Sequence, residues 1–158
     1  MKVLELTSPE ETDALGRRLG ALLRGGDFVS LTGGLGAGKT HFVRGVAVGA
    51  GVAPGEVSSP TYAIVQTYPD GRLPLVHADL YRLEEAGALE ATGFYDLDDG
   101  RAAFLVEWTD RVPESVPRDA LRLSLEAVGA TARRLRAEAT GARSQALLEA
   151  WWEGQENG

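Results

Sequence analysis

The sequence of 158 residues contains no cysteine. It therefore encodes no disulfide, no thiolate metal site and no cysteine nucleophile. A run of about 18 apolar residues, which a membrane-spanning helix requires, is absent as well. The residues after Met1 have neither a long apolar stretch nor a small-residue cleavage site, so a signal peptide is not expected. These absences favour a cytoplasmic protein with no membrane partner.

Lysine is nearly absent: of 16 basic residues, two are lysine, at Lys2 and Lys39. The net charge of −7 and the pI of about 4.9 indicate an acidic surface. Such a surface repels phosphate backbones, which disfavours free-standing nucleic-acid binding. A lysine kept within a glycine-rich stretch at position 39 suggests a role that arginine cannot fill.

The composition, 44% hydrophobic and 25% charged, is typical of one globular domain, which we expect to span 1–158. Apolar periodicity and turn residues predict a three-layer α/β sandwich like that of P-loop NTPases, with a mixed, mostly parallel sheet and an added hairpin that turns at 69–72. The last few residues are expected to be disordered. The predicted helices cover 8–24, 40–49, 84–92 and 143–153, and the predicted strands cover 27–31, 61–68, 73–78, 102–106, 121–127 and 132–140.

The stretch Gly33-Gly34-Leu35-Gly36-Ala37-Gly38-Lys39-Thr40 matches the phosphate-binding pattern G-x-x-x-x-G-K-[ST] without a gap. Glycines let successive backbone N–H groups point into one concavity, and the following helix adds the partial positive charge of its N-terminus. The Lys39 ammonium can reach the β- and γ-phosphates, and the Thr40 hydroxyl can ligate Mg²⁺. A strand before the loop and a helix after it complete the expected context.

Two acidic residues follow apolar strands and are candidates for holding Mg²⁺ or orienting the attacking water. Glu107 ends the run Ala103–Val106, and Asp79 ends a looser run that His77 interrupts. Glu107 could instead cap a helix or pair with Arg111. His77 by itself is more typical of a buried, hydrogen-bonded histidine than of a ligand or base.

Three other features have two interpretations each. Ser58–Tyr62 is either a switch segment that senses the γ-phosphate or a proline-anchored loop. Trp108 either fills the core or belongs to a partner surface, and Trp151-Trp152 more often pack a last helix than bind a ligand. No His, Asp and Glu cluster has zinc spacing, and no G-x-S-x-G is present.

Four motifs in this order resemble the TsaE (YjeE) family of bacterial P-loop ATPases, over most of the chain. They are Gly-x-Leu-Gly-Ala-Gly-Lys-Thr at 33–40, Ser-Pro-Thr-Tyr at 59–62, His-x-Asp-Leu-Tyr-Arg at 77–82 and Val-Glu-Trp at 106–108. The family usually has an acid at the position of Gly34.

The resemblance implies a weak ATPase that acts with the proteins TsaD and TsaB. That assembly transfers threonylcarbamoyl to adenosine 37 of tRNAs reading ANN codons, and ATP hydrolysis supports its turnover. Contact with tRNA would be indirect. The implied roles place Lys39 and Thr40 at the phosphates and Mg²⁺, Thr61 in the switch-like loop, Asp79 and Glu107 as catalytic or magnesium-binding acids, and Thr7 to Thr12 beside the adenine.

Two other functions remain open from the sequence. A small-molecule kinase could use the same glycine loop, although Arg133, Arg134 and Arg136 are expected on an alternating strand rather than on a lid. A nucleotide-dependent interaction module that does not hydrolyse ATP is the other alternative.

Overall fold

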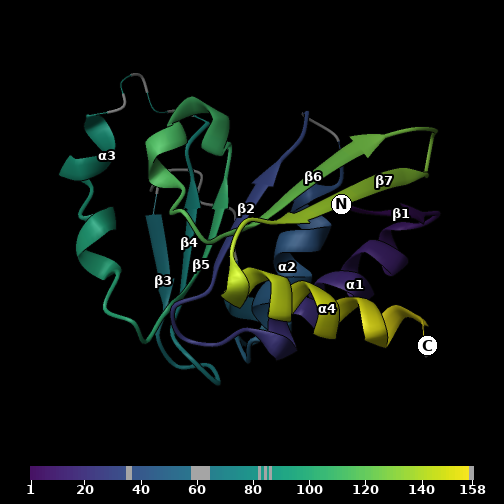
Figure 1. Cartoon of the computed structure of the whole chain (residues 1–158), viewed down its shortest axis with the longest axis horizontal. Coiled ribbons are helices and arrows are strands. Elements are labelled where there is room, and N and C mark those ends of the chain that lie inside the picture. The colour runs from purple at the N-terminus through teal and green to yellow at the C-terminus, as the bar shows by residue number, and fades with distance from the viewer. Residues whose placement is uncertain (35–36, 58–64, 82, 84, 86, 157–158) are drawn as a thin grey trace.

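The computed structural model describes residues 1–34, 37–57, 65–81, 83, 85 and 87–156. Within these residues the chain forms a seven-stranded sheet in the order β1-β7-β6-β2-β5-β4-β3, with helices packed on it (Figure 1). No helix in these ranges is long and apolar enough to cross a membrane. The strands are β1 (Lys2–Leu6), β2 (Phe28–Thr32), β3 (Val65–Tyr68), β4 (Leu75–Asp79), β5 (Ala103–Glu107), β6 (Leu121–Ala127) and β7 (Arg133–Ala139), and the helices are α1 (Pro9–Leu22), α2 (Lys39–Gly49), α3 (Ala88–Ala91) and α4 (Ala142–Glu156).

The first helix begins where the sequence signals predict. Ser8 has an extended backbone, and its hydroxyl accepts a hydrogen bond from the Glu11 backbone N–H at 3.2 Å. Pro9 occupies the first helical position, where its missing N–H costs no hydrogen bond. The cap thus fixes the start of α1.

Glycines allow α1 and α2 to pack at very short range. A Cβ placed on Gly20 of α1 would lie 2.0 Å from the Val46 carbonyl oxygen of α2. A Cβ placed on Gly45 of α2 would lie 2.3 Å from the Asp13 carbonyl oxygen of α1. Because any larger side chain would clash with backbone at both positions, the two helices are fixed against each other.

The centre of the sheet is parallel and both of its sides are antiparallel. Strand β2 pairs in parallel with β5 and β6, and β5 pairs in parallel with β4. The hairpins β3–β4 and β6–β7 and the pair β1–β7 are antiparallel. The predicted mixed sheet with a parallel core is therefore confirmed, and the carboxyl ends of β2, β4 and β5 meet at one edge.

Two apolar clusters lie on opposite faces of the sheet. One joins α1, α2 and α4 to the sheet and includes Phe42 and Trp151; Figure 1 shows these three helices on one side of β6 and β7. The second lies under α3 and neighbouring 3₁₀ turns and includes Phe94 and Phe104. Trp151 is fully buried and its indole N–H donates to the Leu15 carbonyl at 3.1 Å, so the packing interpretation of this residue is confirmed.

The structure corrects two expectations. Strand β1 was not predicted, because Lys2–Leu6 has no strong alternation of apolar and polar residues. In the structure its side chains are mostly exposed. Of the helix predicted over 84–92, residues 84 and 86 lie outside the described residues, and the described part forms a single turn, Ala88–Ala91, which ends before Gly93 with its left-handed backbone (φ 80°). The left-handed Gly93 stops the helical backbone from continuing, whereas Gly87 itself has helical dihedral angles.

Candidate functional site

The glycine loop lies between the end of β2 and the start of α2. Gly38 is the residue before α2 and has a left-handed backbone (φ 95°). Gly33 has φ 149°, and a Cβ there would lie 2.4 Å from the Leu125 carbonyl oxygen. Both positions therefore require glycine. Gly34 faces open space, because a Cβ added there would have nothing within 4 Å, whereas Leu35 and Gly36 lie outside the described residues.

Lys39 is 7% exposed and contacts both the loop and Trp108, the residue after β5. Its Nζ donates to the Gly33 carbonyl oxygen at 2.8 Å and lies 3.7 Å from the centre of the Trp108 ring. Burial lowers the pKa of Lys39, against the attraction of Glu107 and other nearby acids. Thr40 is exposed in the first turn of α2, next to this ammonium group in sequence.

The two candidate acids are neighbours across the parallel strands. Asp79 at the end of β4 is in register with Glu107 at the end of β5, and Glu107 is in register with Leu31 of β2. Burial raises the pKa of Asp79, and the Glu107 charge raises it further, although the Tyr81 backbone N–H donates to Asp79 Oδ1 at 3.0 Å. The strand order thus brings both carboxyl groups to the edge where the loop begins.

Glu107 is held by a histidine. Its Oε2 lies 2.7 Å from His77 Nε2, and the two side chains are nearly buried. Among the described residues the His77 Nδ1 has no hydrogen-bond partner. An Nε2–H tautomer that donates to the carboxylate leaves only a lone pair at Nδ1. Burying an unpaired lone pair costs less free energy than burying an unpaired N–H. The alternative pairing of Glu107 with Arg111 is not found: the Arg111 Nη1 donates to the Leu83 carbonyl at 3.2 Å.

Trp108 follows Glu107 in an unusual backbone conformation. Its φ is 59°, and among the described non-glycine residues no other φ is positive. Its N–H donates to the Leu31 carbonyl at 3.1 Å, which ties the residue to the end of β2. The ring is half-buried and lies 4.9 Å from the Tyr81 ring, centre to centre. Trp108 therefore belongs both to the loop environment and to the surface.

Other predicted site residues have different positions. Thr7 is exposed before α1, and its backbone N–H donates to a Glu11 carboxylate oxygen at 2.7 Å. Thr12 is buried in α1, where its hydroxyl donates to the Ser8 carbonyl at 3.3 Å. Thr61, with the whole predicted switch segment 58–62, lies outside the described residues. The nucleotide contacts expected of these residues stay predictions.

Sequence reasoning missed Arg133 as a neighbour of the glycine loop. A Cβ on Gly38 would lie 3.6 Å from Arg133 Nε, and Arg133 Nη1 donates to the Gly129 and Ala132 carbonyls. Because β6 pairs with β2, the hairpin carries the first residue of β7 back to the loop. A signal was present in the sequence: the long hairpin turn around Gly129.

The described residues fit a magnesium nucleotide better than a protein-held metal. The loop supplies backbone that only glycine tolerates and one ammonium group, as a phosphate cradle requires. In the described ranges no group of three or more His, Cys, Asp or Glu residues could hold a metal ion. Mg²⁺ bound to nucleotide needs few protein ligands because phosphate oxygens and waters complete its shell, and Thr40 and Glu107 have the oxygen chemistry to supply those few.

Comparison with known proteins places this site in a family. The family model described as "Threonylcarbamoyl adenosine biosynthesis protein TsaE" matches residues 6–135. A protein of Bacillus subtilis (strain 168) named tRNA threonylcarbamoyladenosine biosynthesis protein TsaE is 38% identical over 142 residues, covering 90% of this chain and 88% of its own. A protein of the same name from Streptomyces coelicolor is 47% identical over 128 residues, covering 77% of this chain and 84% of its own.

A solved structure supports the same assignment. The crystal structure of Bacillus subtilis YdiB superposes with a TM-score of 0.81 at 30% identity, and the match covers 98% of this chain and 95% of that one. The shared fold, the family model and the curated relatives agree. This chain therefore belongs to the TsaE family, whose members are named for tRNA threonylcarbamoyladenosine biosynthesis.

Proposed function

We propose that this chain is an ATP-binding and ATP-hydrolysing subunit required for threonylcarbamoylation of adenosine 37 in tRNAs reading ANN codons. One observation carries the proposal: a glycine loop with a buried Lys39 lies beside a pair of adjacent strand-end acids, Asp79 and Glu107. Phosphoryl transfer to water needs a cation at the phosphates and a carboxylate nearby, and the loop and the two strands supply both.

Each residue has a definite part in this proposal. Lys39 neutralises the β- and γ-phosphates, and the loop backbone from Gly33 to Thr40 binds their oxygens. The Thr40 hydroxyl and Glu107 would hold Mg²⁺, which would supply charge stabilisation at the transferring phosphoryl group. Asp79 or Glu107 orients the attacking water, and His77 keeps the Glu107 carboxylate in place by its 2.7 Å hydrogen bond.

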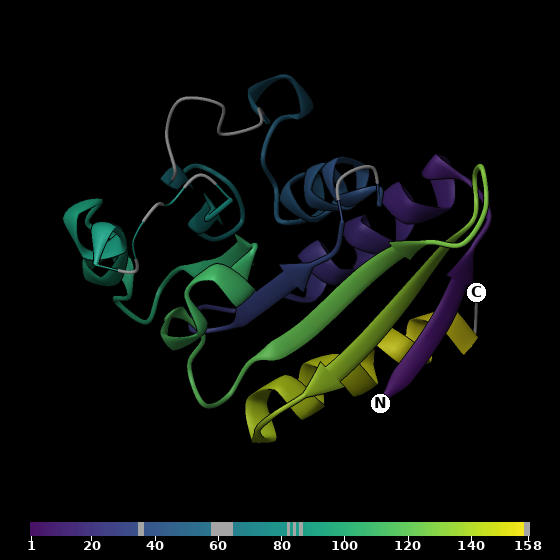
Figure 2. The ribbon, with the colours of Figure 1, turned by 90° about the horizontal axis from the view of Figure 1, so that it is seen from above.

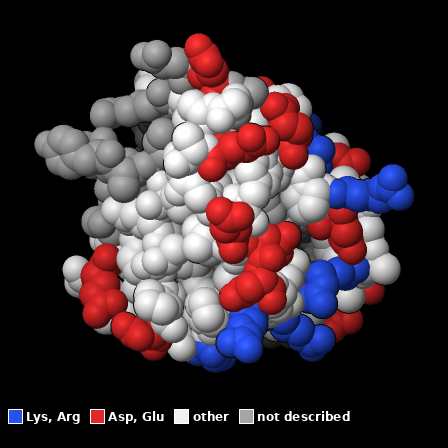
Figure 3. Space-filling view, turned by 90° about the vertical axis from the view of Figure 1, so that its left-hand side faces the viewer, with Lys and Arg blue, Asp and Glu red and all other residues white. Residues whose placement is uncertain are grey.

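The proposed partners are the proteins TsaD and TsaB, with tRNA reached through the assembly. Support comes from the acidic net charge of −7 and from its distribution. Figure 3 shows acidic side chains gathered over the face that carries α3. A face of this sign favours a basic protein surface over a tRNA backbone. Exposed acids in this region are Glu85, Glu90, Asp96, Asp98, Asp99 and Glu114.

Reconstitution tests the proposal. TsaB, TsaD, tRNA and the threonylcarbamoyl donor are combined with and without this chain and ATP, and modified tRNA and released phosphate are measured together. We expect multiple turnovers with the unaltered chain and none with Lys39→Ala. Lys2→Ala, which changes the other lysine in the exposed strand β1, is the matched control and should behave like the unaltered chain.

Three results would count against the proposal. Multiple turnover without this chain would remove its role in the assembly. Transfer of phosphate to a small acceptor in a screen would favour the kinase alternative. ATP binding without phosphate release, even with both partners present, would favour an interaction module that does not hydrolyse ATP.

A further inference from the structure

The ammonium group of Lys39 has a second binding place in this structure. Its Nζ lies 3.7 Å from the centre of the Trp108 ring, well within the range of about 6 Å over which a cation interacts with an aromatic face. The same nitrogen donates to the Gly33 carbonyl at 2.8 Å. Both interactions are strongest when the ammonium group is shielded from water, and the Lys39 side chain is shielded, since the residue is 7% exposed.

Trp108 is held in this position by neighbouring side chains. Its ring packs on the Tyr81 ring, 4.9 Å away, and the Arg111 guanidinium lies over the Tyr81 ring, 5.2 Å from the ring centre. Arg111 is tied in turn to the Leu83 carbonyl at 3.2 Å. These contacts thus run from the glycine loop to two exposed residues, Tyr81 after β4 and Arg111 in the turn after β5.

The backbone of Trp108 indicates that the position is specified rather than incidental. A left-handed backbone is unfavourable for a non-glycine residue and persists where surrounding contacts enforce it. Here the hydrogen bond to Leu31 and the packing on Tyr81 are the contacts that do so. The result is a tryptophan face turned toward the loop lysine.

We propose that Tyr81 and Arg111 are positioning residues that hold Trp108 as a binding place for the Lys39 ammonium, in competition with the nucleotide phosphates. This inference rests on the proposed nucleotide site, and it predicts the direction in which these residues change nucleotide affinity. An ammonium group that turns to the β- and γ-phosphates leaves the ring, so breaking the Lys39–Trp108 contact offsets part of the binding free energy. Weakening the stack therefore strengthens nucleotide binding, whereas a supporting residue of an ordinary site would weaken it when removed.

The test is titration calorimetry with a non-hydrolysable ATP analogue and Mg²⁺. We expect Trp108→Leu, Tyr81→Leu and Arg111→Gln each to lower the dissociation constant, by about three- to tenfold for Trp108→Leu and less for the other two, as loss of a shielded cation–π contact implies. Trp152→Phe, on α4, is the matched control and should leave the constant unchanged. Unchanged or weaker binding by all three variants would overturn the inference.

Fluorescence gives a second measurement that does not depend on those variants. The chain has three tryptophans, so Trp151→Phe with Trp152→Phe leaves Trp108 as the sole reporter. We expect the nucleotide analogue to shift its emission, and we expect Lys39→Met in the same background to show the shifted emission without nucleotide. Calorimetric binding with unchanged emission would count against the inference alone. No nucleotide uptake by the unaltered chain would overturn both this inference and the proposed function.

Discussion

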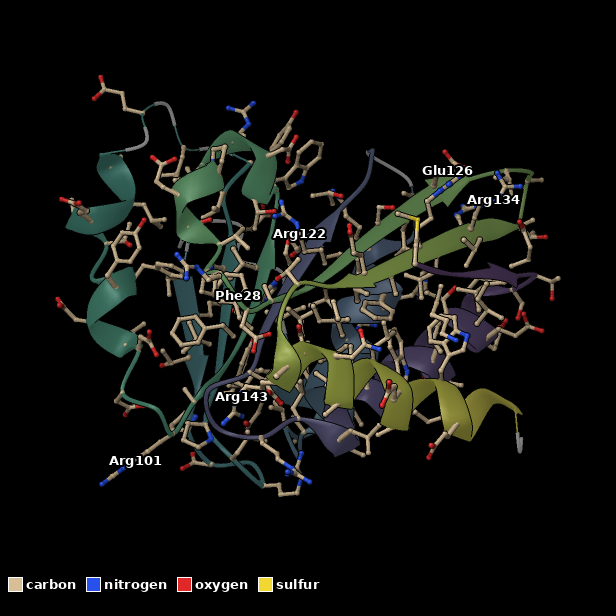
Figure 4. All side chains as sticks on the ribbon, in the orientation of Figure 1. Phe28, Arg101, Arg122, Glu126, Arg134 and Arg143 are labelled. Carbon is tan, nitrogen blue, oxygen red and sulfur yellow. The ribbon has the colours of Figure 1, made fainter. Side chains whose placement is uncertain are left out.

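The two halves of the sheet differ in where their charged residues lie: at the strand ends in one half and on an open face in the other. Strands β2, β5 and β4 are parallel and covered on both faces, and the acids Asp79 and Glu107 lie at the carboxyl ends of β4 and β5. Strands β6, β7 and β1 pair antiparallel with one another, although β6 is parallel to β2 on its other side. Helices cover one face of these strands, and Figure 2, which looks down on the other face, shows no helix over them. Arg134 and Glu126 lie on this open face, pointing away from α4 (Figure 4).

The energetic consequence differs between the halves. In the parallel half, burial shifts the pKa of Lys39 down and that of Asp79 up, so the charged form of each group is disfavoured by folding. In the antiparallel half, Arg134 pairs with Glu5 at 2.6 Å and with Glu126 at 3.0 Å at the surface. The parallel half thus gives up stability to hold reactive groups, and the antiparallel half holds charge at little cost.

The largest effect is expected for Glu107→Gln in the parallel half, which should lower phosphate release without removing nucleotide binding. Glu107→Gln keeps a group that can hydrogen-bond His77 but removes the carboxylate charge, so nucleotide binding should remain. Phosphate release should fall by about a hundredfold or more, as for loss of a catalytic acid or base. Calorimetry and phosphate release on the same preparation check this, and near-normal release would move the catalytic role to Asp79.

A large effect on stability is expected where the antiparallel half meets the helices. Trp151→Ala removes a fully buried ring that packs on Phe42 and donates to the Leu15 carbonyl. The free energy of unfolding should fall by about 3–5 kcal/mol, as for other buried aromatic truncations. Urea denaturation measures it. A loss below about 1 kcal/mol would show that α4 contributes little to the folded state.

Asp79→Asn should raise stability while lowering turnover. The folded protein binds the Asp79 proton more tightly than the unfolded chain, because the folded pKa is raised. The contribution of Asp79 to stability is therefore intact below its ordinary pKa and is lost as the pH rises through the raised value. The variant should have the higher Tm at neutral pH, and its advantage should vanish at acidic pH. An equal or lower Tm at neutral pH would contradict the burial argument.

The smallest effect is expected on the open face. Arg134→Ala removes two exposed ion pairs, with Glu5 and Glu126, whose charges are screened by water. The free energy of unfolding should change by less than about 1 kcal/mol, and the difference should shrink further at high salt. A loss of free energy of unfolding as large as that of Trp151→Ala would show that the surface charges of the antiparallel half are not held at little cost.

The sequence predicts the elements that carry strong local signals. The Ser8 cap, the glycine loop, the hairpin at 69–72 and the alternation over 121–127 all lead to elements in the structure. These signals succeed because capping, turn chemistry and period-two burial act over a few residues.

Features that depend on partners far along the chain were not predictable in this way. The His77–Glu107 contact joins two strands that are 30 residues apart and needs the parallel pairing of β4 with β5. The approach of Arg133 to Gly38 needs the order β6-β2, and the turn of Trp108 toward Lys39 needs its left-handed backbone. Strand β1 pairs with β7, near the other end of the chain, and places Leu6 in the core, which its local sequence does not reveal.

The glycine contacts between α1 and α2 have a mechanical consequence. With backbone against backbone at Gly20 and Gly45, the helix that follows the phosphate loop has no room to slide or rotate. On the opposite flank, where β4 and β5 end, the chain is held by the Leu80 N–H to the Glu107 carbonyl and by the Trp108 N–H to the Leu31 carbonyl, with no glycine contact of this kind among the described residues of the strands. We therefore expect an exchange of the proposed nucleotide to move the ends of β4 and β5 more than α2, and a partner that responds to ATP to contact those strand ends.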